Sequence, residues 1–175
     1  VSNQRRFAIK ESGNNLKAEH NLTKKFISIV GKNKAAEVYA YEMCDRTKNG
    51  RLTRMYSEYL EGKTLLKFLP TLKKNPEAIK SIVIQVLTIL QTISKIRPDF
   101  RHNDLHLDNI YITNNGTKVK IIDFGLATNK DIVNPEINKT KNGGRSLRMY
   151  GIFRGNHIMY DTHFFLNSLH YSNTY

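Results

Sequence analysis

Cysteine and acidic residues are scarce in this 175-residue chain, and tryptophan is absent. The single Cys44 cannot form a disulfide within the chain, which fits a reducing compartment. Only 15 Asp and Glu stand against 28 Lys and Arg, so the formal net charge is +13. This balance favours polyanionic partners such as nucleotides. No basic patch with interspersed aromatic residues indicates a specific nucleic-acid partner.

Long hydrophobic runs and a signal peptide are also missing. The longest apolar run, SIVIQVLTIL, is too short and too interrupted by polar residues to predict a bilayer span. We therefore expect an intracellular, cytoplasmic protein with no membrane partner. Hydrophobic residues make up 39% of the chain and aromatic residues 10%, which is enough for a packed fold.

Sequence patterns divide the chain into a strand-rich front and a helical back. Strands are predicted at 6–10, 38–44 and 51–59, the last two as a hairpin. An amphipathic helix is predicted over 16–27, and 60–64 is expected to be a connector. Apolar residues at helical spacing predict a mostly buried helix over 77–96, with Asn75 as its N-cap and Pro76 in its first turn.

The stretch FRHNDLHLDNIYI, residues 100–112, concentrates polar side chains between apolar flanks. Two short apolar runs follow, separated by a turn with Asn-Gly at 115–116, which is a strong hairpin signal. Pairing about this turn brings Asn109 close to Asp123. The sequence therefore predicts that an amide oxygen and a carboxylate meet at the open end of one hairpin.

Amide and carboxylate oxygens are hard ligands that suit Mg²⁺. Asn109 and Asp123 are thus candidate metal ligands, and Gly125 is expected to let the backbone turn away after Asp123. Asp104, five residues before Asn109, can face the same space. It could accept a hydrogen bond from an attacking hydroxyl and orient that group for phosphoryl transfer.

A zinc cluster is the rival interpretation of the histidines and aspartates in this stretch. Their alternating spacing lacks a second group of ligands, so we do not favour it. We expect His102 to be a structural histidine packed near Phe124 and Asp108 to be a solvated loop residue.

The two motifs resemble the catalytic loop and the metal-binding motif of the protein-kinase-like fold. The matching residues are His102, Asp104, Leu105 and Asn109 in HNDLHLDNI, and Asp123, Phe124 and Gly125 in IIDFG. FAIK is similar to the strand whose lysine holds the nucleotide phosphates, here Lys10, with Glu19 as its helix partner. YDTHFFLNSL resembles the buried helix of the kinase large lobe, where Asp161 would hold the backbone of the catalytic loop.

The resemblance implies an α+β, bilobal protein-kinase-like fold. It implies a partial, β-rich small lobe over 1–57, a hinge over 58–62 and a mainly helical, partial large lobe over 63–175. The implied reaction is phosphoryl transfer from ATP, with Mg²⁺, to Ser or Thr hydroxyls of a protein substrate. The absence of Trp and of a clear tyrosine-kinase loop signature leaves Ser/Thr as the default.

The resemblance also implies roles for individual residues. The implied catalytic residues are Lys10, Asp104, Asn109 and Asp123, of which Asn109 and Asp123 would bind the metal. The implied nucleotide-binding residues are Lys10, Glu19, Glu58, Leu60, Tyr111 and Asp123, with Ser57 at the border of the pocket. Backbone groups of Glu58 and Leu60 would bind adenine, and Glu11 and Glu37 are alternatives to Glu19.

The sequence departs from the kinase pattern at several points. Only nine residues precede Lys10, too few for the glycine-rich loop, and the chain ends soon after the Asp161 helix, so we expect an incomplete domain with poor turnover. Asn103 replaces the usual Arg, which predicts that activation-loop phosphorylation is not the main switch. The segment 126–160 lacks an APE motif, and NPEINK at 134–139 lies too early to replace it.

Two alternatives stay open at this point. His106 replaces the Lys that commonly contacts the transferred phosphate, which also resembles aminoglycoside or choline phosphotransferases; a peptide groove beside 145–155 would instead favour proteins. The second alternative is a pseudokinase or interaction module.

DTHFFLNSL in addition resembles kinases of large DNA viruses, which would place the protein in the host cytoplasm or the virion.

Overall fold

Two antiparallel sheets of three strands each, with helices around them, make up the described part of the chain. The computed structural model describes residues 6–14, 16–47, 50–72, 74–113, 116–132, 137 and 157–172. The first sheet has the order β1-β3-β2, with β1 at Phe7–Ser12, β2 at Val38–Thr47 and β3 at Gly50–Glu58. The second has the order β4-β5-β6, with β4 at Gly62–Thr64, β5 at Ile110–Thr113 and β6 at Val119–Ile121.

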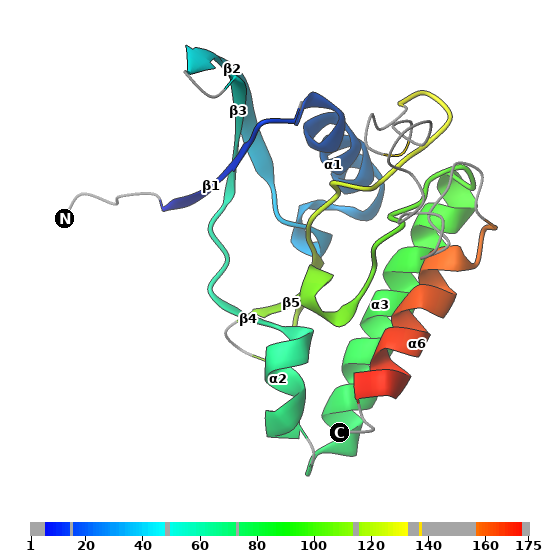
Figure 1. Ribbon diagram of the computed structural model, residues 1–175. Coiled ribbons are helices and arrows are strands. Elements are labelled where there is room, and N and C mark those ends of the chain that lie inside the picture. Colours follow the sequence, from blue (N-terminus) through cyan, green and yellow to red (C-terminus); the bar gives the residue numbers. More distant parts are fainter. Residues whose placement is uncertain are drawn as a thin grey trace.

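The helices in the described residues are α1 (Lys17–Val30), α2 (Leu65–Leu72), α3 (Pro76–Ile96) and α6 (Tyr160–Ser172). Short 3-10 turns, η1 at Lys32–Lys34 and η2 at Leu107–Asn109, lead into the connections after them. Helix α1 lies beside the first sheet, whereas α3 and α6 run side by side on the far side of the second sheet (Figure 1). The mixed α+β architecture agrees with the prediction.

The alternation of side chains along β1 decides which face of the strand carries Lys10. Phe7 and Ile9 are each 51% exposed, whereas Ala8 and Lys10 lie on the other, half-buried face. Successive residues of a strand point to opposite faces, so Lys10 shares the face of Ala8. In the ladder, Lys10 pairs with Met55 of β3. The lysine is therefore held on a paired strand and points toward α1.

Helix α3 begins as predicted but is less buried than predicted. The side chain of Asn75 accepts a hydrogen bond from the backbone N–H of Ala78 at 3.1 Å, which is N-cap geometry. Its buried residues are Ile82, Val86, Ile89, Leu90 and Ile93. Ile84 is 53% exposed, so the expectation that most of the helix is buried is wrong. The buried residues lie on one face, and Ala78, Ile79, Val83 and Leu87 pack against the same core while partly exposed.

The 21 residues of α3 meet the length and composition that a bilayer crossing requires, alone among the helices described. The ten-residue run SIVIQVLTIL covers only part of this helix, so it underestimated the length of the apolar segment. A core helix meets the same criteria, and one face of α3 packs in the core of this chain.

Two other expectations need correction. The helix predicted over 16–27 extends to Val30, and the connector at 60–64 contains strand β4, which pairs with β5. A side chain at Gly62 would bring its Cβ within 2.0 Å of the Ile112 carbonyl oxygen, so only glycine fits this close approach. Helix α2 was not predicted, because its LLKFLPTL stretch carries a proline that weakens the helical signal.

The hairpin after the polar stretch has the predicted register. Ile112 pairs with Val119, and the backbone N–H of Ile122 donates to the Asn109 carbonyl oxygen at 3.0 Å. Asn115 lies outside the described residues, whereas Gly116 has a φ of 64° that suits the turn. The pairing brings Asn109 next to Ile122, as the sequence predicted.

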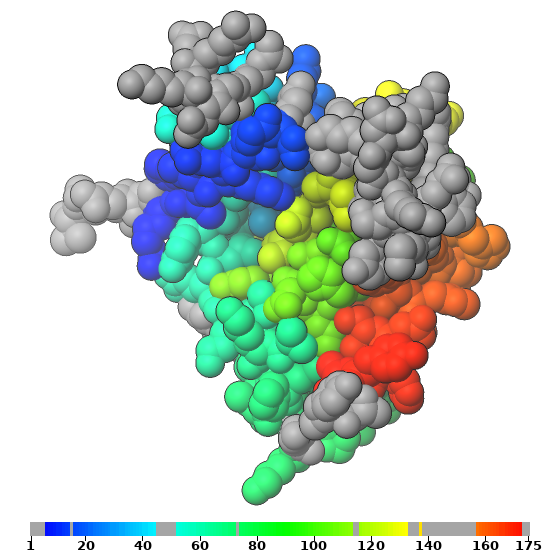
Figure 2. Space-filling view, viewed as in Figure 1, coloured from blue at the N-terminus to red at the C-terminus, as the bar shows by residue number. Residues whose placement is uncertain are grey.

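Aromatic rings join α1 to the segments that carry the polar motifs. Phe26 of α1 lies with its ring centroid 4.9 Å from that of Phe124 and 5.5 Å from that of Phe100. Phe26, Phe124 and Phe165 of α6 are fully buried in one hydrophobic cluster. In the space-filling view, α6, in orange and red, lies against green residues from the middle of the chain (Figure 2). The polar motifs therefore rest on a shared core.

A matched pair of substitutions in α3 tests this packing. Ile82 is 2% exposed and Ile84 is 53% exposed. We expect Ile82→Ala to lower the free energy of unfolding by about 2–5 kcal/mol, because it removes buried methyl groups and leaves a cavity. Ile84→Ala should stay within about 0.5 kcal/mol of the unchanged protein. Urea unfolding followed by circular dichroism measures both, and equal losses would contradict the assigned face.

Candidate active site

A cavity of about 310 Å³ lies between the first sheet, α1 and the end of β6. Its lining includes all six residues that the kinase resemblance assigned to the nucleotide: Lys10, Glu19, Glu58, Leu60, Tyr111 and Asp123. Ser57, expected at the border of the pocket, also lines it. These residues are far apart in the sequence, and the fold brings them together around one space.

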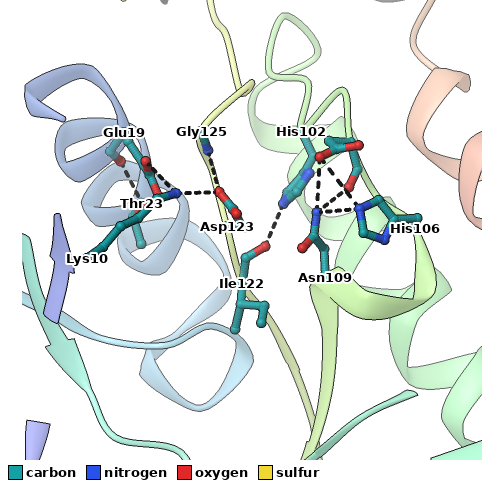
Figure 3. Close-up of polar contacts among 10 residues, drawn as sticks. Lys10, Glu19, Thr23, His102, His106, Asn109, Ile122, Asp123 and Gly125 are labelled. Atoms are coloured by element: carbon teal, nitrogen blue, oxygen red, sulfur yellow. Dashed lines mark hydrogen bonds and ion pairs between the residues drawn. The ribbon is translucent and has the colours of Figure 1, made fainter. Parts of the chain in front are cut away.

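The ammonium group of Lys10 forms the central contact of this cavity. Its Nζ donates to Oε1 and Oε2 of Glu19 at 2.9 and 3.0 Å, and to Oδ1 of Asp123 at 2.8 Å. Figure 3 shows Lys10 of β1 pointing between the Glu19 side chain of α1 and Asp123 after β6. One cation thus holds together a strand, a helix and the metal motif.

Burial and neighbouring charges set the pKa values in this contact. Burial and the nearby Asp123 raise the pKa of Glu19, and Lys10 offsets this only in part. Burial favours the neutral amine, but Glu19 and Asp123 outweigh this effect, so the pKa of Lys10 lies above its ordinary value. Burial also raises the pKa of the Asp123 carboxyl, yet the neighbouring Lys10 more than compensates, and the net pKa is lowered. At neutral pH the cavity therefore presents a charged ammonium and an ionised carboxylate.

Glu19, and neither of its alternatives, pairs with the lysine. Its side chain is 6% exposed in the first turn of α1. Glu11 instead pairs with Arg54 at 2.6 Å, and Glu37 with Lys32 at 2.8 Å. Lys10 and Glu19 come together over the short spacing of nine residues because β1 leads almost directly into α1.

The backbone at the metal motif turns at a different residue from the one predicted. Asp123 itself has a φ of 58°, in the left-handed region, whereas Gly125 does not lie in that region. Aspartate tolerates this conformation better than most residues. A Cβ at position 125 would lie 2.9 Å from Oδ1 of Asp123, so a side chain there would displace the carboxylate. The Gly125 N–H donates to the same oxygen at 3.1 Å and helps to fix the carboxylate.

A buried carboxylate of α6 holds the polar loop that contains Asp104. Asp161 is 6% exposed and accepts hydrogen bonds from the backbone N–H groups of His102 and Asn103, each at 2.8 Å. Burial raises the pKa of this carboxyl, while the two N–H groups favour its ionised form. Asn103 has a φ of 67°, which the two hydrogen bonds help to maintain. The predicted role of Asp161 is confirmed.

His102 is a packing residue, as predicted. Its ring lies 4.9 Å from that of Phe124, and its Nε2 is 3.1 Å from the Ile122 carbonyl oxygen. Complete burial lowers the pKa of His102, so the imidazole is neutral at physiological pH. This contact links the start of the polar loop to the residue before Asp123.

Asp104, His106 and Asn109 converge at the far end of the same loop. Nδ2 of Asn109 donates to the Asp104 carbonyl oxygen at 2.8 Å and to its Oδ2 at 3.3 Å. The other atom of that amide, Oδ1, is then the one suited to a cation. His106 lies close by, with Nε2 3.2 Å from Asn109 Nδ2 and 3.7 Å from Asp104 Oδ2 (Figure 3). Its Nδ1 accepts from the N–H of Asp108 at 3.2 Å.

The donor set around this loop suits a hard cation shared with a phosphate. Asn109 offers an amide oxygen and Asp123 a carboxylate, and the backbone bond from Ile122 to Asn109 keeps the two segments adjacent. Within the described ranges, no three His, Cys, Asp or Glu side chains gather closely enough to hold a metal ion alone. A cation here would need further oxygens from a ligand.

The stretch between β3 and β4 uses several of its polar groups within the chain. The Glu58 carboxylate binds Lys120 at 2.5 and 2.6 Å, and the Glu58 N–H donates to the Glu37 carbonyl oxygen at 2.7 Å. The Tyr111 hydroxyl donates to the carbonyl oxygens of Leu60 and Gly62 at 3.0 and 2.8 Å. Adenine binding by the backbone of Glu58 and Leu60 stays a prediction.

Some residues of the site were missed or misjudged from the sequence. Asp108 is no solvated bystander, because its Oδ1 accepts from the Thr64 hydroxyl at 2.9 Å and ties the loop to β4. The sequence did not lead us to predict Lys120 as the partner of Glu58. Its position within the apolar run KVKII could have indicated a partly buried lysine that needs an acidic partner. The NPEINK segment at 134–139, apart from the buried Ile137, and the segment 145–155, beside which a peptide groove was considered, lie outside the described residues.

Comparison with known families gives one match that spans most of the chain. The family described as Protein kinase domain matches residues 1–144. The match contains Lys10 and Asp123, which line the cavity, and the polar loop with Asp104 and Asn109, which are not among its lining residues.

Individual relatives match over shorter stretches. The chain is 50% identical over 56 residues to the probable serine/threonine-protein kinase WNK9 of Oryza sativa subsp. japonica, which is 32% of this chain and 13% of the relative. It is 36% identical over 80 residues to the probable serine/threonine-protein kinase WNK6 of the same plant, covering 45% of this chain and 18% of the relative. It is 34% identical over 92 residues to the serine/threonine-protein kinase WNK of Caenorhabditis elegans, covering 52% and 5%.

Each of these matches covers a small part of the relative. The matched stretches span less than a fifth of each of the three proteins. The relatives come from plants and animals, so the resemblance to viral kinases receives no support from them.

The buried carboxylate of Asp161 gives a prediction for this site. In Asp161→Asn, one of the two backbone N–H groups would face the new amide N–H₂ group and lose its acceptor. We expect a loss of about 1–3 kcal/mol in the free energy of unfolding. The control is Asp108→Asn, which keeps an acceptor oxygen for Thr64 and should cost much less. Urea unfolding curves of equal midpoint for the two variants would count against this role.

Proposed function

The chain belongs to the protein kinase domain family, and from this premise we propose that it carries the phosphoryl-transfer site of a serine/threonine protein kinase. The reaction is transfer of the γ-phosphoryl group of ATP to a Ser or Thr hydroxyl of a protein. The observation that carries the proposal is the contact of Lys10 with Glu19 and Asp123 inside the cavity.

Lys10 and Glu19 act together on the nucleotide. Lys10 is charged and fixed on two sides, so its ammonium can contact the α- and β-phosphates without first losing freedom. The apolar lining of the cavity includes Ala36, Val38 and Met55, which suits a flat heterocycle. Glu58, Leu60 and Tyr111 border the same space, and we assign the adenine end to them.

Asn109 and Asp123 would hold Mg²⁺, which supplies charge neutralisation between the phosphates. Asp104 is the hydroxyl-orienting carboxylate. Its Oδ2 is partly held by Asn109 Nδ2 at 3.3 Å, so the acceptor hydroxyl would be oriented next to the residue that binds the metal. The presence of Lys10, Asp104, Asn109 and Asp123 favours direct transfer over a passive binding role. Hydrogen bonds connect Lys10 to Asp123, Ile122 to Asn109, and Asn109 to Asp104.

The proposed organisation follows the two sheets. We assign 1–57 to the small lobe and 63–175 to the large lobe, with the hinge at 58–62. The ion pair between Glu58 and Lys120 spans the boundary and supports a hinge at this point. A protein acceptor is favoured over a small molecule because the relatives are named as protein kinases. Since the reaction consumes ATP, we place the protein inside the cell.

Two substitutions separate chemistry from nucleotide binding. Asp104→Asn should lower phosphoryl transfer by about 10²–10⁴-fold because an amide is a poor acceptor for the hydroxyl proton, while MgATP affinity is retained. Asp123→Asn should weaken MgATP binding itself, because it removes an anionic metal ligand.

The measurements are transfer of labelled γ-phosphate to a generic protein acceptor and titration with a fluorescent nucleotide, with and without Mg²⁺. Asp108→Asn is the control, since Asp108 lies on the same loop and binds Thr64. Wild-type transfer in Asp104→Asn would rule out the assigned chemistry.

A further inference from the structure

The segment from Asp123 to Ile132 lies along helix α1 and touches it at several places. Figure 1 shows this segment, in yellow, passing beside α1, and its residues reach the surface near blue residues of the N-terminal part in Figure 2. At one end Asp123 meets Lys10, which in turn binds Glu19 of α1. In the middle the rings of Phe124 and Phe26 are in contact.

A further contact is an ion pair that the proposed chemistry does not use. Lys25 of α1 binds Oδ2 of Asp131 at 2.5 Å, and Arg97, which follows α3, binds the same oxygen at 3.0 Å. These two cations lower the pKa of the Asp131 carboxyl, so it is ionised at neutral pH. One carboxylate therefore joins α1 to the end of α3.

Asp131 is held in place from several sides. Arg97 is itself fixed by a two-atom contact with Asp99, at 2.8 and 2.9 Å, and Asp99 also accepts from the N–H of Lys130 at 2.9 Å. The side chain of Asn129 accepts from the N–H groups of Asp131 and Ile132 at 2.9 and 2.7 Å. The carboxylate is thus presented to Lys25 by an ordered turn.

The start of the same segment is fixed to the polar loop by uncharged contacts. Nδ2 of the buried Asn103 donates to the Leu126 carbonyl oxygen at 2.9 Å and to the Thr128 hydroxyl at 3.3 Å. The backbones of Arg101 and Thr128 exchange two hydrogen bonds, at 2.8 and 2.9 Å. The segment therefore cannot shift without breaking these bonds, and α1 is attached to a fixed support.

We propose that Asp131 is a positioning residue for the phosphoryl-transfer site. By binding Lys25 and Arg97, it holds α1 in the place where Glu19 pairs with Lys10. This role rests on the proposed function, because it matters only if the Lys10 contact serves catalysis. The anchor is a fixed carboxylate of the chain, so it requires no added phosphate group.

The geometry explains how one distant ion pair can affect Glu19. Lys25 lies six residues after Glu19 on the same helix, about 9 Å along the axis. A helix tethered at both positions resists rotation and sliding better than one held at its first turn alone. Phe26, the residue after Lys25, is fully buried. A partial displacement of α1 at this point would therefore disturb the core.

Loss of the carboxylate should do more than remove an attraction. Lys25 and Arg97 both bind the same oxygen, so without it two cations would be left close together. The side chains of Lys25 and Arg97 are 30% and 18% exposed, but that of Asp131 is 46% exposed, so salt should screen the interaction substantially. The structure thus predicts that loss of the Asp131 carboxylate loosens α1 in a salt-sensitive way and leaves the first sheet unaffected.

The test compares Asp131→Asn and Lys25→Met with the unchanged protein. Backbone amide exchange over 17–30 should become about two- to fivefold faster in both variants, the range expected for a partly exposed ion pair. Phosphoryl transfer at saturating MgATP should fall by a similar factor. Lys24→Met is the matched control, because Lys24 is an exposed lysine of the same helix. Asp131→Glu keeps the negative charge, so its exchange and transfer rates should lie closer to those of the unchanged protein than the rates of Asp131→Asn do.

Salt dependence separates positioning by charge from a merely structural role. Raising ionic strength should speed exchange of α1 in the unchanged protein and have little effect in Asp131→Asn. Wild-type exchange and wild-type transfer in both Asp131→Asn and Lys25→Met would overturn the proposal. Exchange over 17–30 is read without activity, so it decides whether Asp131 holds α1 even if Asp104→Asn retains full transfer and the kinase proposal fails.

Discussion

A single ammonium group, that of Lys10, connects the parts of the molecule that must act together. It lies on a strand of the first sheet, and its two partners are Glu19 of α1 and Asp123 after the second sheet. Two carboxylates so close to each other repel unless a cation lies between them. This contact therefore joins α1 and the Asp123 segment to the first sheet at the cavity.

Around this charged centre the chain uses buried hydrogen bonds to fix the backbone. Asp161 receives two N–H groups of the polar loop, and Asn103 joins that loop to Leu126 and Thr128. These atoms are buried, where a hydrogen bond that is lost cannot be replaced by water. The charges of the Lys10 contact therefore lie at the cavity, where a ligand would bind. The hydrogen bonds of Asp161 and Asn103 lie where the backbone of the polar loop is fixed.

Spacing in the sequence predicted much of the local structure, and the kinase resemblance named the residues that the fold brings to the cavity. The Asn-Gly turn set the register that joins Asn109 to Ile122, and helical spacing together with Asn75 set the start of α3. The sequence failed where the answer depends on tertiary contacts. It could not tell that Ile84 points away from the core, or that Lys25 would meet Asp131 across 106 positions.

The most direct test of this account is the dissociation constant for MgATP in Lys10→Met, measured beside Lys24→Met. Methionine keeps most of the side-chain volume and removes the charge that both Glu19 and the phosphates require. A hydrogen bond to a charged group contributes about 1.5–3 kcal/mol, so the dissociation constant should rise by at least about tenfold in Lys10→Met and remain unchanged in Lys24→Met. Equal affinity in the two variants would contradict the central role of the Lys10 contact.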